Sequence, residues 1–265
     1  MESPQYEDDE APPLLDALEK LRWRLVKIAA ALFLGVLVGF GVAHFTPVTE
    51  LLVHPVRPFL AHQGGRLAAL SPLTPFMLEL KVGLVIGILV SLPVILYQLW
   101  GHLSPILQAD ERRLILPALW VAVLLFALGL YVGWLALPIS LEWLFKFQAD
   151  YVRAVVNADD YFSFATRLLL AFGLVFEMPI VLMILTTLGL VTPRFLRAKR
   201  RHAIVIIAFL SALITPGDVA SMFLMMIPMT VLYEVSILGS VLISRRAPTP
   251  DESDSEGSES LAGTS

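Results

Sequence analysis

Long apolar runs dominate the pattern of hydrophobic and polar positions, and they predict a bundle of membrane-spanning helices. A transmembrane helix needs about 20 predominantly apolar residues. Six runs can be compared with that length: Val26–Phe45, Pro75–Trp100, Leu114–Leu137, Tyr161–Leu190, His202–Thr215 and Val219–Ile243. The fifth run has only 14 residues. We still expect it to cross, with local thinning of the bilayer, because basic residues abut one end and a tight Pro216-Gly217 turn follows the other.

Two further features of the pattern extend this prediction. Leucines at helical spacing, interleaved with charges, precede the first run and indicate a short amphipathic helix on the membrane surface, with Trp23 as an interfacial anchor. The loops Thr46–Thr74 and Pro138–Asp160 are rich in apolar residues. They are therefore expected to form short helices that cap the outer face. No internal repeat is visible in the sequence.

Composition agrees with a polytopic membrane protein. The 265 residues are 57% hydrophobic and 16% charged, whereas soluble domains are about 45–50% apolar and about 25% charged. Ten of the acids lie near the two ends, so we expect disordered acidic tails at residues 1–13 and 248–265 around a membrane domain at 14–247. The absence of cysteine excludes disulfides and thiolate chemistry.

The distribution of Lys and Arg predicts the orientation. Thirteen of these residues fall on one side of the six runs: Lys20, Arg22, Arg24, Lys27, Arg112, Arg113, Arg194, Arg197, Lys199, Arg200, Arg201, Arg245 and Arg246. The other side has only Arg57, Arg66, Lys146 and Arg153, while Lys81 and Arg167 lie inside runs. The positive-inside rule places the first group, and with it both termini, in the cytoplasm.

Glu177 is the main candidate for chemistry, because it lies inside the long apolar run Tyr161–Leu190. A charged side chain at the bilayer centre costs roughly 2.5–3.5 kcal/mol on insertion scales. Pro179, two residues later, removes a helix amide and predicts a kink at the same place. Glu177 is either a structural residue, protonated or paired with another span, or a polar docking point that faces a cavity or a partner helix.

Other clusters are less specific. Asp110 and Glu111, beside Arg112 and Arg113, form either a topogenic charge cluster or a carboxylate site for a basic peptide. Asp218 most simply caps the last helix. The methionines around Met222 indicate packing more than an adaptable peptide surface. The five histidines lack ligand spacing, so we expect no metal site, no cofactor and, without a nucleophile–base motif, no catalytic residue.

Several motifs, in order along the chain, resemble the TatC family, the multi-spanning subunit of the twin-arginine (Sec-independent) protein translocase. The resemblance covers about Leu18–Ile243. The motifs are Pro93-Val94-Ile95-Leu96-Tyr97-Gln98-Leu99-Trp100, Pro105 with Glu111-Arg112-Arg113, Phe172-Gly173-x-x-Phe176-Glu177-x-Pro179, Ile214-Thr215-Pro216-x-Asp218 and Ile227-Pro228-Met229.

The resemblance implies an all-α membrane protein with six transmembrane helices, a concave, glove-shaped bundle and a periplasmic cap, both termini being cytoplasmic. It implies a receptor for signal peptides that bear paired arginines, in the bacterial cytoplasmic (inner) membrane. It implies TatA and TatB as single-span partners, a homo-oligomer within the complex, and export of folded cargo at the expense of the proton motive force. Nothing indicates a nucleic-acid partner.

The resemblance also assigns roles to individual residues. Glu111 matches the loop glutamate that meets the arginine pair, and Arg22 matches the arginine of the amino-terminal motif. We expect Asp110 or Glu19, as nearby cytoplasmic carboxylates, to help Glu111. Glu177 matches the intramembrane glutamate for partner docking. The matching structural or assembly positions are Pro55, Pro93, Pro105, Phe176, Pro179, Pro216 and Asp218.

Three departures from the family pattern change these expectations. Lys20 stands where the amino-terminal motif has glutamate, and Glu19 lies one place earlier, about 100° around a helix. His102 replaces a usual phenylalanine. Met222 and Phe223 stand where a more polar pair can occur, which is expected to alter partner docking. The alternative function is a proton-coupled small-solute transporter that uses Glu177, although the absent repeat argues against it.

Overall fold

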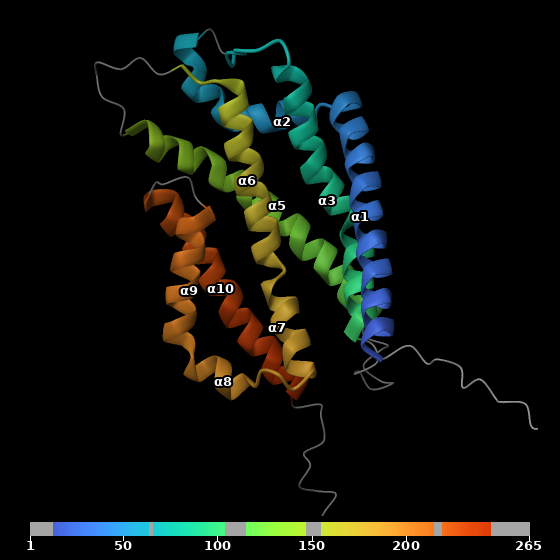
Figure 1. Ribbon diagram of the computed structural model, residues 1–265. Coiled ribbons are helices and arrows are strands. Elements are labelled where there is room, and N and C mark those ends of the chain that lie inside the picture. The colour runs from blue at the N-terminus through green and yellow to red at the C-terminus, as the bar shows by residue number, and fades with distance from the viewer. Residues whose placement is uncertain (1–12, 64–65, 104–114, 147–154, 215–218, 245–265) are drawn as a thin grey trace, which may run out of the picture. The chain divides into compact units, whose positions relative to one another are not determined.

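Helices make up almost all of the described structure (Figure 1). The computed structural model describes residues 13–63, 66–103, 115–146, 155–214 and 219–244. The elements are α1 (Pro13–Phe45), α2 (Val48–Val53), the 3-10 helix η1 (His54–Gln63), α3 (Thr74–Leu103), α5 (Ile115–Lys146), α6 (Ala158–Phe176), α7 (Met178–Thr187), α8 (Pro193–Ala198), α9 (Arg200–Ile214) and α10 (Val219–Ser244). They form two compact units, residues 1–124 with 155–166 and residues 125–154 with 167–265.

Five helical segments of the described chain are long and apolar enough to cross a membrane. They are Leu21–Phe45, Thr74–Leu99, Leu116–Lys146, Ala158–Thr187 and Met222–Val241. This confirms the predicted all-α membrane class and makes five of the six predicted spans candidate spans by length and composition. The fifth predicted span is the 15-residue helix α9, which is shorter than the others. A sixth crossing therefore stays a prediction.

Two predicted boundaries are wrong. The expected surface helix and first span form the single helix α1, because no proline or glycine interrupts the chain between Leu14 and Gly35 and both segments share the helical period. The third span does not end at Leu137, since α5 continues through Pro138 to Lys146. A proline inside an apolar helix is tolerated where neighbouring groups satisfy the freed carbonyl.

A glycine seam joins α1 to α3 in the first unit. Gly35 and Gly39 on α1 face Gly87 and Gly83 on α3, so closely that a Cβ on Gly39 would lie 2.7 Å from the Gly87 amide nitrogen. Small residues spaced four apart let helix backbones approach in a membrane, where van der Waals packing drives association. Figure 1 shows α1 and α3 lying side by side along this seam.

The first loop also belongs to this unit, and it folds as the predicted short helices, α2 and η1. Leu52, Val56 and Leu60 are buried. The Tyr161 hydroxyl at the start of α6 donates to the Leu52 carbonyl oxygen. Backbone hydrogen bonds join Ala68 to the segment just before α6, with Ala158 N donating to Ala68 O at 2.8 Å. The first loop is thus fixed to the beginning of α6.

The second unit is built on contacts among the remaining parts of α5 and α6 and the helices α7 to α10. Gly129 of α5 lies against the α6 backbone, since a Cβ there would be 2.7 Å from the Phe172 carbonyl oxygen. Helix α10 packs against both α7 and α9. The side chains of Thr186 and Ser240 hydrogen bond between α7 and α10 at 3.0 Å.

Candidate functional site

Glu177 occupies the break between α6 and α7. The amide of Glu177 donates to the Leu174 carbonyl at 3.1 Å, a tighter turn than the α-helical bond, and the amides of Ile180 and Val181 both donate to the Glu177 carbonyl at 3.1 Å. Pro179 lies in the first turn of α7, where its missing amide costs no helical hydrogen bond. The predicted kink therefore coincides with the intramembrane carboxyl group, as the sequence indicated.

The carboxyl group of Glu177 is buried and has no partner among the described residues. The residue is 6% exposed, and neither Oε1 nor Oε2 has a hydrogen-bond partner in the described part of the chain. A buried polar group without a hydrogen bond is costly. A structural glutamate paired with another span finds no partner within the described residues, whereas a protonated structural glutamate and a polar docking point both stay predictions.

Apolar packing from α5 holds this break in place. A Cβ on Gly129 would lie 2.9 Å from the Phe176 Cβ, and a Cβ on Gly173 would lie 2.8 Å from the Phe126 ring. Phe172, Phe176 and Pro179 are themselves buried. The two glycines thus let α5 and α6 approach closely beside Glu177, and the surroundings offer the carboxylate little polarity.

The described part of the expected signal-peptide site lies on α1. Glu19 and Arg22 are exposed and three residues apart, which places them on one face of the helix. The other expected residues, Asp110 and Glu111, lie outside the described residues, as do Pro105, Pro216 and Asp218. Whether Glu19 and Glu111 come together is therefore untested and stays a prediction.

The remaining expected positions are spread over three elements. Pro55 is buried in η1, and Pro93 lies half-buried inside α3, which continues through it. On α10, Met222 is half-buried and Phe223 is 52% exposed. Met225 and Met229 are buried, which confirms packing as the role of those two methionines.

Two polar contacts were not singled out from the sequence. Arg24 of α1 donates from Nη1 to the Gln98 carbonyl of α3 at 3.5 Å, which brings the amino-terminal half of α1 to the end of α3 that precedes residues 104–114. Lys81 of α3 reaches Asp159 Oδ1 at 2.5 Å and Ser163 Oγ at 2.7 Å. A lysine inside an apolar run is expected to need a partner. That signal could have prompted a search for an acid such as Asp159.

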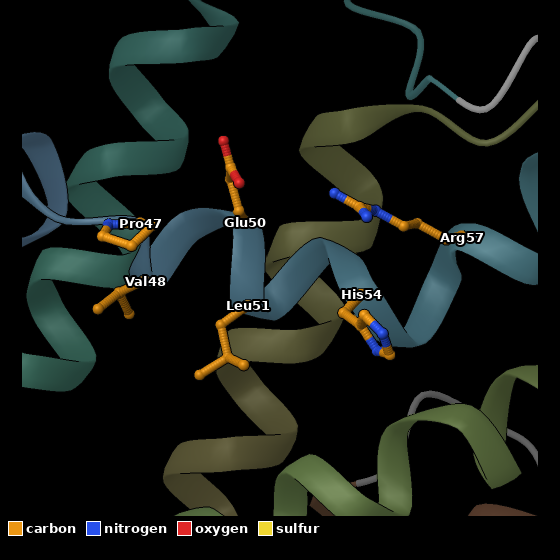
Figure 2. A pocket seen from close by; sticks show the side chains of 6 residues that line it. All are labelled: Pro47, Val48, Glu50, Leu51, His54 and Arg57. Carbon is orange, nitrogen blue, oxygen red and sulfur yellow. The ribbon is translucent and has the colours of Figure 1, made fainter.

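A surface depression of about 410 Å³ lies on the first loop and α2 (Figure 2). Its lining residues are Pro47, Val48, Glu50, Leu51, His54 and Arg57. Figure 2 shows Glu50 and Arg57 projecting to one side of the helical segment and Leu51 to the other. Because most of these side chains are exposed, the depression lacks the enclosure of a small-molecule site.

The chain matches the family model described as Sec-independent protein translocase protein (TatC) over residues 16–228. Curated relatives include the TatC protein of Aquifex aeolicus, 37% identical over 237 residues, which are 88% of this chain and 97% of the relative. The TatC protein of Desulforapulum autotrophicum is 32% identical over 255 residues, which are 95% and 93% of the two chains. These relatives support a translocase component and not the solute-transporter alternative.

Solved structures give the same result. A crystal structure of the twin-arginine translocase receptor TatC is 36% identical and superposes with a TM-score of 0.71, covering 86% of this chain and 99% of that chain. A second structure of this receptor, in the detergent DDM, has a TM-score of 0.72 and covers 84% and 98%. The chain belongs to the TatC family and is a multi-pass membrane component of the Sec-independent, twin-arginine protein translocase.

Proposed function

We propose that this chain is the signal-peptide receptor and the assembly platform of a translocase that exports folded proteins across the bacterial cytoplasmic membrane. The similarity to structures described as twin-arginine translocase receptors supports the receptor role. The observation that carries the platform role is the buried carboxyl group of Glu177, which lacks a partner among the described residues. A partner helix that brought a polar side chain to this group would satisfy it, which supports the platform role.

The proposed signal-peptide site is cytoplasmic and combines Glu111 and Asp110 with Glu19 and Arg22. A carboxylate accepts a guanidinium group through two parallel hydrogen bonds, which makes paired arginines a better ligand than paired lysines. The Arg24–Gln98 contact supports this grouping. It joins α1, only five residues after Glu19, to the end of α3, and Glu111 follows α3 by eight residues.

The proposed partner-docking site is Glu177, with Met222 and Phe223 on α10. Single-span partners of the TatA and TatB type would present a helix with a polar side chain to the carboxyl group. A hydrogen bond between two helices inside a membrane is worth about 0.6–2 kcal/mol, and it also removes the cost of the unpaired acid. Phe223 is 52% exposed and offers apolar contact area to an incoming helix.

The proposal also includes the orientation of the chain in the membrane, its copy number and the energy source for transport. Both termini are cytoplasmic by the positive-inside rule, the complex contains several copies of this chain, and cargo crosses at the expense of the proton motive force. The chain acts as a receptor and a scaffold, not as an enzyme.

Site-specific photocrosslinking tests the receptor role. A photoreactive residue replaces Gln108, near Glu111, and the protein is offered a signal peptide with Arg-Arg or with Lys-Lys. We expect crosslinks to the Arg-Arg peptide that are lost in Glu111→Ala, while the abundance of the protein is unchanged. Normal crosslinking in Glu111→Ala, or equal crosslinking of both peptides, would contradict the assignment.

A further inference from the structure

Five cations lie within eight residues where α8 meets α9. They are Arg194, Arg197, Lys199, Arg200 and Arg201, and we call them the basic corner. The sequence has no Asp or Glu from Met178 to Gly217, so nothing nearby along the chain neutralises them. All five residues are exposed. Figure 1 shows α8 as the link between α7 and α9.

Contacts with neighbouring residues hold the basic corner in a defined shape. Thr192 caps α8 by accepting a hydrogen bond from the Phe195 amide at 3.2 Å. Leu196 is buried, and its carbonyl oxygen accepts a hydrogen bond from the Tyr233 hydroxyl of α10 at 2.9 Å. With Leu196 facing inward, the other residues of this short helix are left on its outer side.

The charge of the basic corner is only partly neutralised inside the protein. Arg200 forms an ion pair with Glu234 of α10 at 2.7 Å. No ion pair is found within the described residues for Arg194, Arg197, Lys199 or Arg201. Arg200 therefore attaches the corner to α10, and four positive charges remain available to an external anion.

The predicted crossing of α9 would hold this charge at the level of the lipid headgroups. With 15 residues, α9 is about 22 Å long, shorter than a hydrocarbon core of about 30 Å. Its first turn carries Arg200 and Arg201, which cannot enter the core cheaply. Phe195, 53% exposed beside these cations, adds an apolar side chain of the kind that buries into the interface.

We propose that the basic corner is a binding site for anionic phospholipid headgroups. The phosphate of a lipid is an acceptor that Arg194 and Arg197 can hold through paired hydrogen bonds, while Phe195 contacts the acyl region. A net-negative headgroup is favoured over a zwitterionic one because the acid of this region, Glu234, is already paired with Arg200, which leaves the four available cations without a carboxylate to attract a positive headgroup nitrogen. The bound lipid seals the place where the short helix α9 meets a thicker bilayer.

Native mass spectrometry of the purified full-length protein measures this preference directly. The protein is mixed with equal amounts of phosphatidylglycerol and phosphatidylcholine that have the same acyl chains, and the bound lipids are counted. The test variant is Arg194→Gln/Arg197→Gln/Lys199→Gln. The matched control is Arg57→Gln/Arg66→Gln/Lys146→Gln, which removes the same charge from exposed positions outside the basic corner.

We expect the wild-type protein and the control to prefer phosphatidylglycerol. In the test variant, the ratio of bound phosphatidylglycerol to bound phosphatidylcholine should be lower by at least about tenfold, because each cation near an anionic surface contributes roughly fivefold to binding. A second variant, Arg194→Lys/Arg197→Lys, keeps the positive charge but loses the paired hydrogen bonds of the guanidinium groups, so its preference should lie between those of the wild-type protein and the test variant. An unchanged preference in the test variant, or an equal loss in the control, would overturn the proposal. Displacement of the lipid by millimolar inorganic phosphate would also overturn it, because the site would then bind a soluble anion.

Discussion

Burying the carboxyl group of Glu177 without a hydrogen-bond partner carries a free-energy cost that the isolated chain must bear. The residue lies at a helix break, with both oxygens buried and without a partner in the described part of the chain. A further step that supplies a hydrogen-bond partner would remove this cost. Under the proposed function, that step is the docking of another subunit.

Substitution of Glu177 should separate docking from signal recognition. Glu177→Ala is expected to weaken crosslinking to the single-span partners about threefold to thirtyfold, as the loss of one interhelical hydrogen bond implies, while binding of the twin-arginine signal is kept. Glu177→Gln, which can still hydrogen bond, should weaken docking less. Quantitative crosslinking in membranes measures both effects.

Ser140→Ala is the matched control, because the Ser140 hydroxyl is also buried and has no partner within the described residues. Equal loss of docking in Ser140→Ala and Glu177→Ala would mean that any buried polar deletion disturbs the complex. Normal assembly and export by Glu177→Ala would refute the docking role.

Lys81 is a second residue whose loss should be measurable. Lys81→Met removes an ion pair with Asp159 and a hydrogen bond to Ser163, and it should lower the free energy of unfolding by about 1–3 kcal/mol. The cost stays below that of a fully buried pair because the Asp159 side chain is 45% exposed. Reversible unfolding in mixed detergent micelles is the measurement.

Lys146→Met serves as the comparison for Lys81→Met. Its ion pair with Glu142 is exposed at both ends, so less than about 0.5 kcal/mol should be lost. Equal destabilisation by the two substitutions would show that the Lys81 contacts add nothing to stability.

At the scale of the elements, the glycine seam between α1 and α3 gives a sharp expectation. Gly39→Ala should destabilise the protein by about 1–3 kcal/mol, because the added Cβ would overlap the α3 backbone near Gly83 and Gly87. Gly41→Ala is the control on the same helix, since nothing lies within 4 Å of a Cβ there. Thermal unfolding in detergent compares the two, and equal stability would contradict close packing at the seam.

Helix existence and type could be predicted from hydrophobic runs alone, whereas boundaries and contacts could not. The run around Glu177 and Pro179 predicted both the span and its break, because both residues act locally on the backbone. The continuation of α5 through Pro138 was missed because its tolerance depends on neighbouring groups. Gly39 and Gly83, or Lys81 and Asp159, are distant in sequence, and only the folded chain shows that they meet.

In the candidate site, too, local features could be predicted from the sequence, whereas contacts between distant residues could not. The burial of Glu177 could be inferred from its apolar neighbours, but the lack of a hydrogen-bond partner required the packing of the helices. The sequence identified Arg24 only as one of the basic residues that predict orientation. Nothing in its sequence context indicates a contact with the Gln98 carbonyl. The roles of Asp110 and Glu111 rest on the family, and they stay predictions.

At the scale of the whole molecule, the orientation in the membrane is open to a simple test. The chain has no cysteine, so a single introduced cysteine is the only one that a maleimide can label. We expect Leu70→Cys, at a residue that is 76% exposed, to react in intact spheroplasts with a reagent that cannot cross the membrane. Arg197→Cys should react only after the membrane is permeabilised.

Labelling of Arg197→Cys in intact spheroplasts would reverse the predicted orientation and place both termini outside. Labelling of Leu70→Cys only after permeabilisation would do the same. Either result would also remove the cytoplasmic location that the signal-peptide site requires.

The attachment of the first loop to α6 has a consequence for the order of events during synthesis. Leu52, Ala68 and Lys81 all bind partners between Val156 and Ser163, which leave the ribosome about 75 to 110 residues later. Until then, α1 and α3 can pair through their glycines, but Lys81 stays without its acid in the lipid. The early half of the chain is therefore a dependent intermediate, at risk of degradation if synthesis stalls before the fourth span arrives.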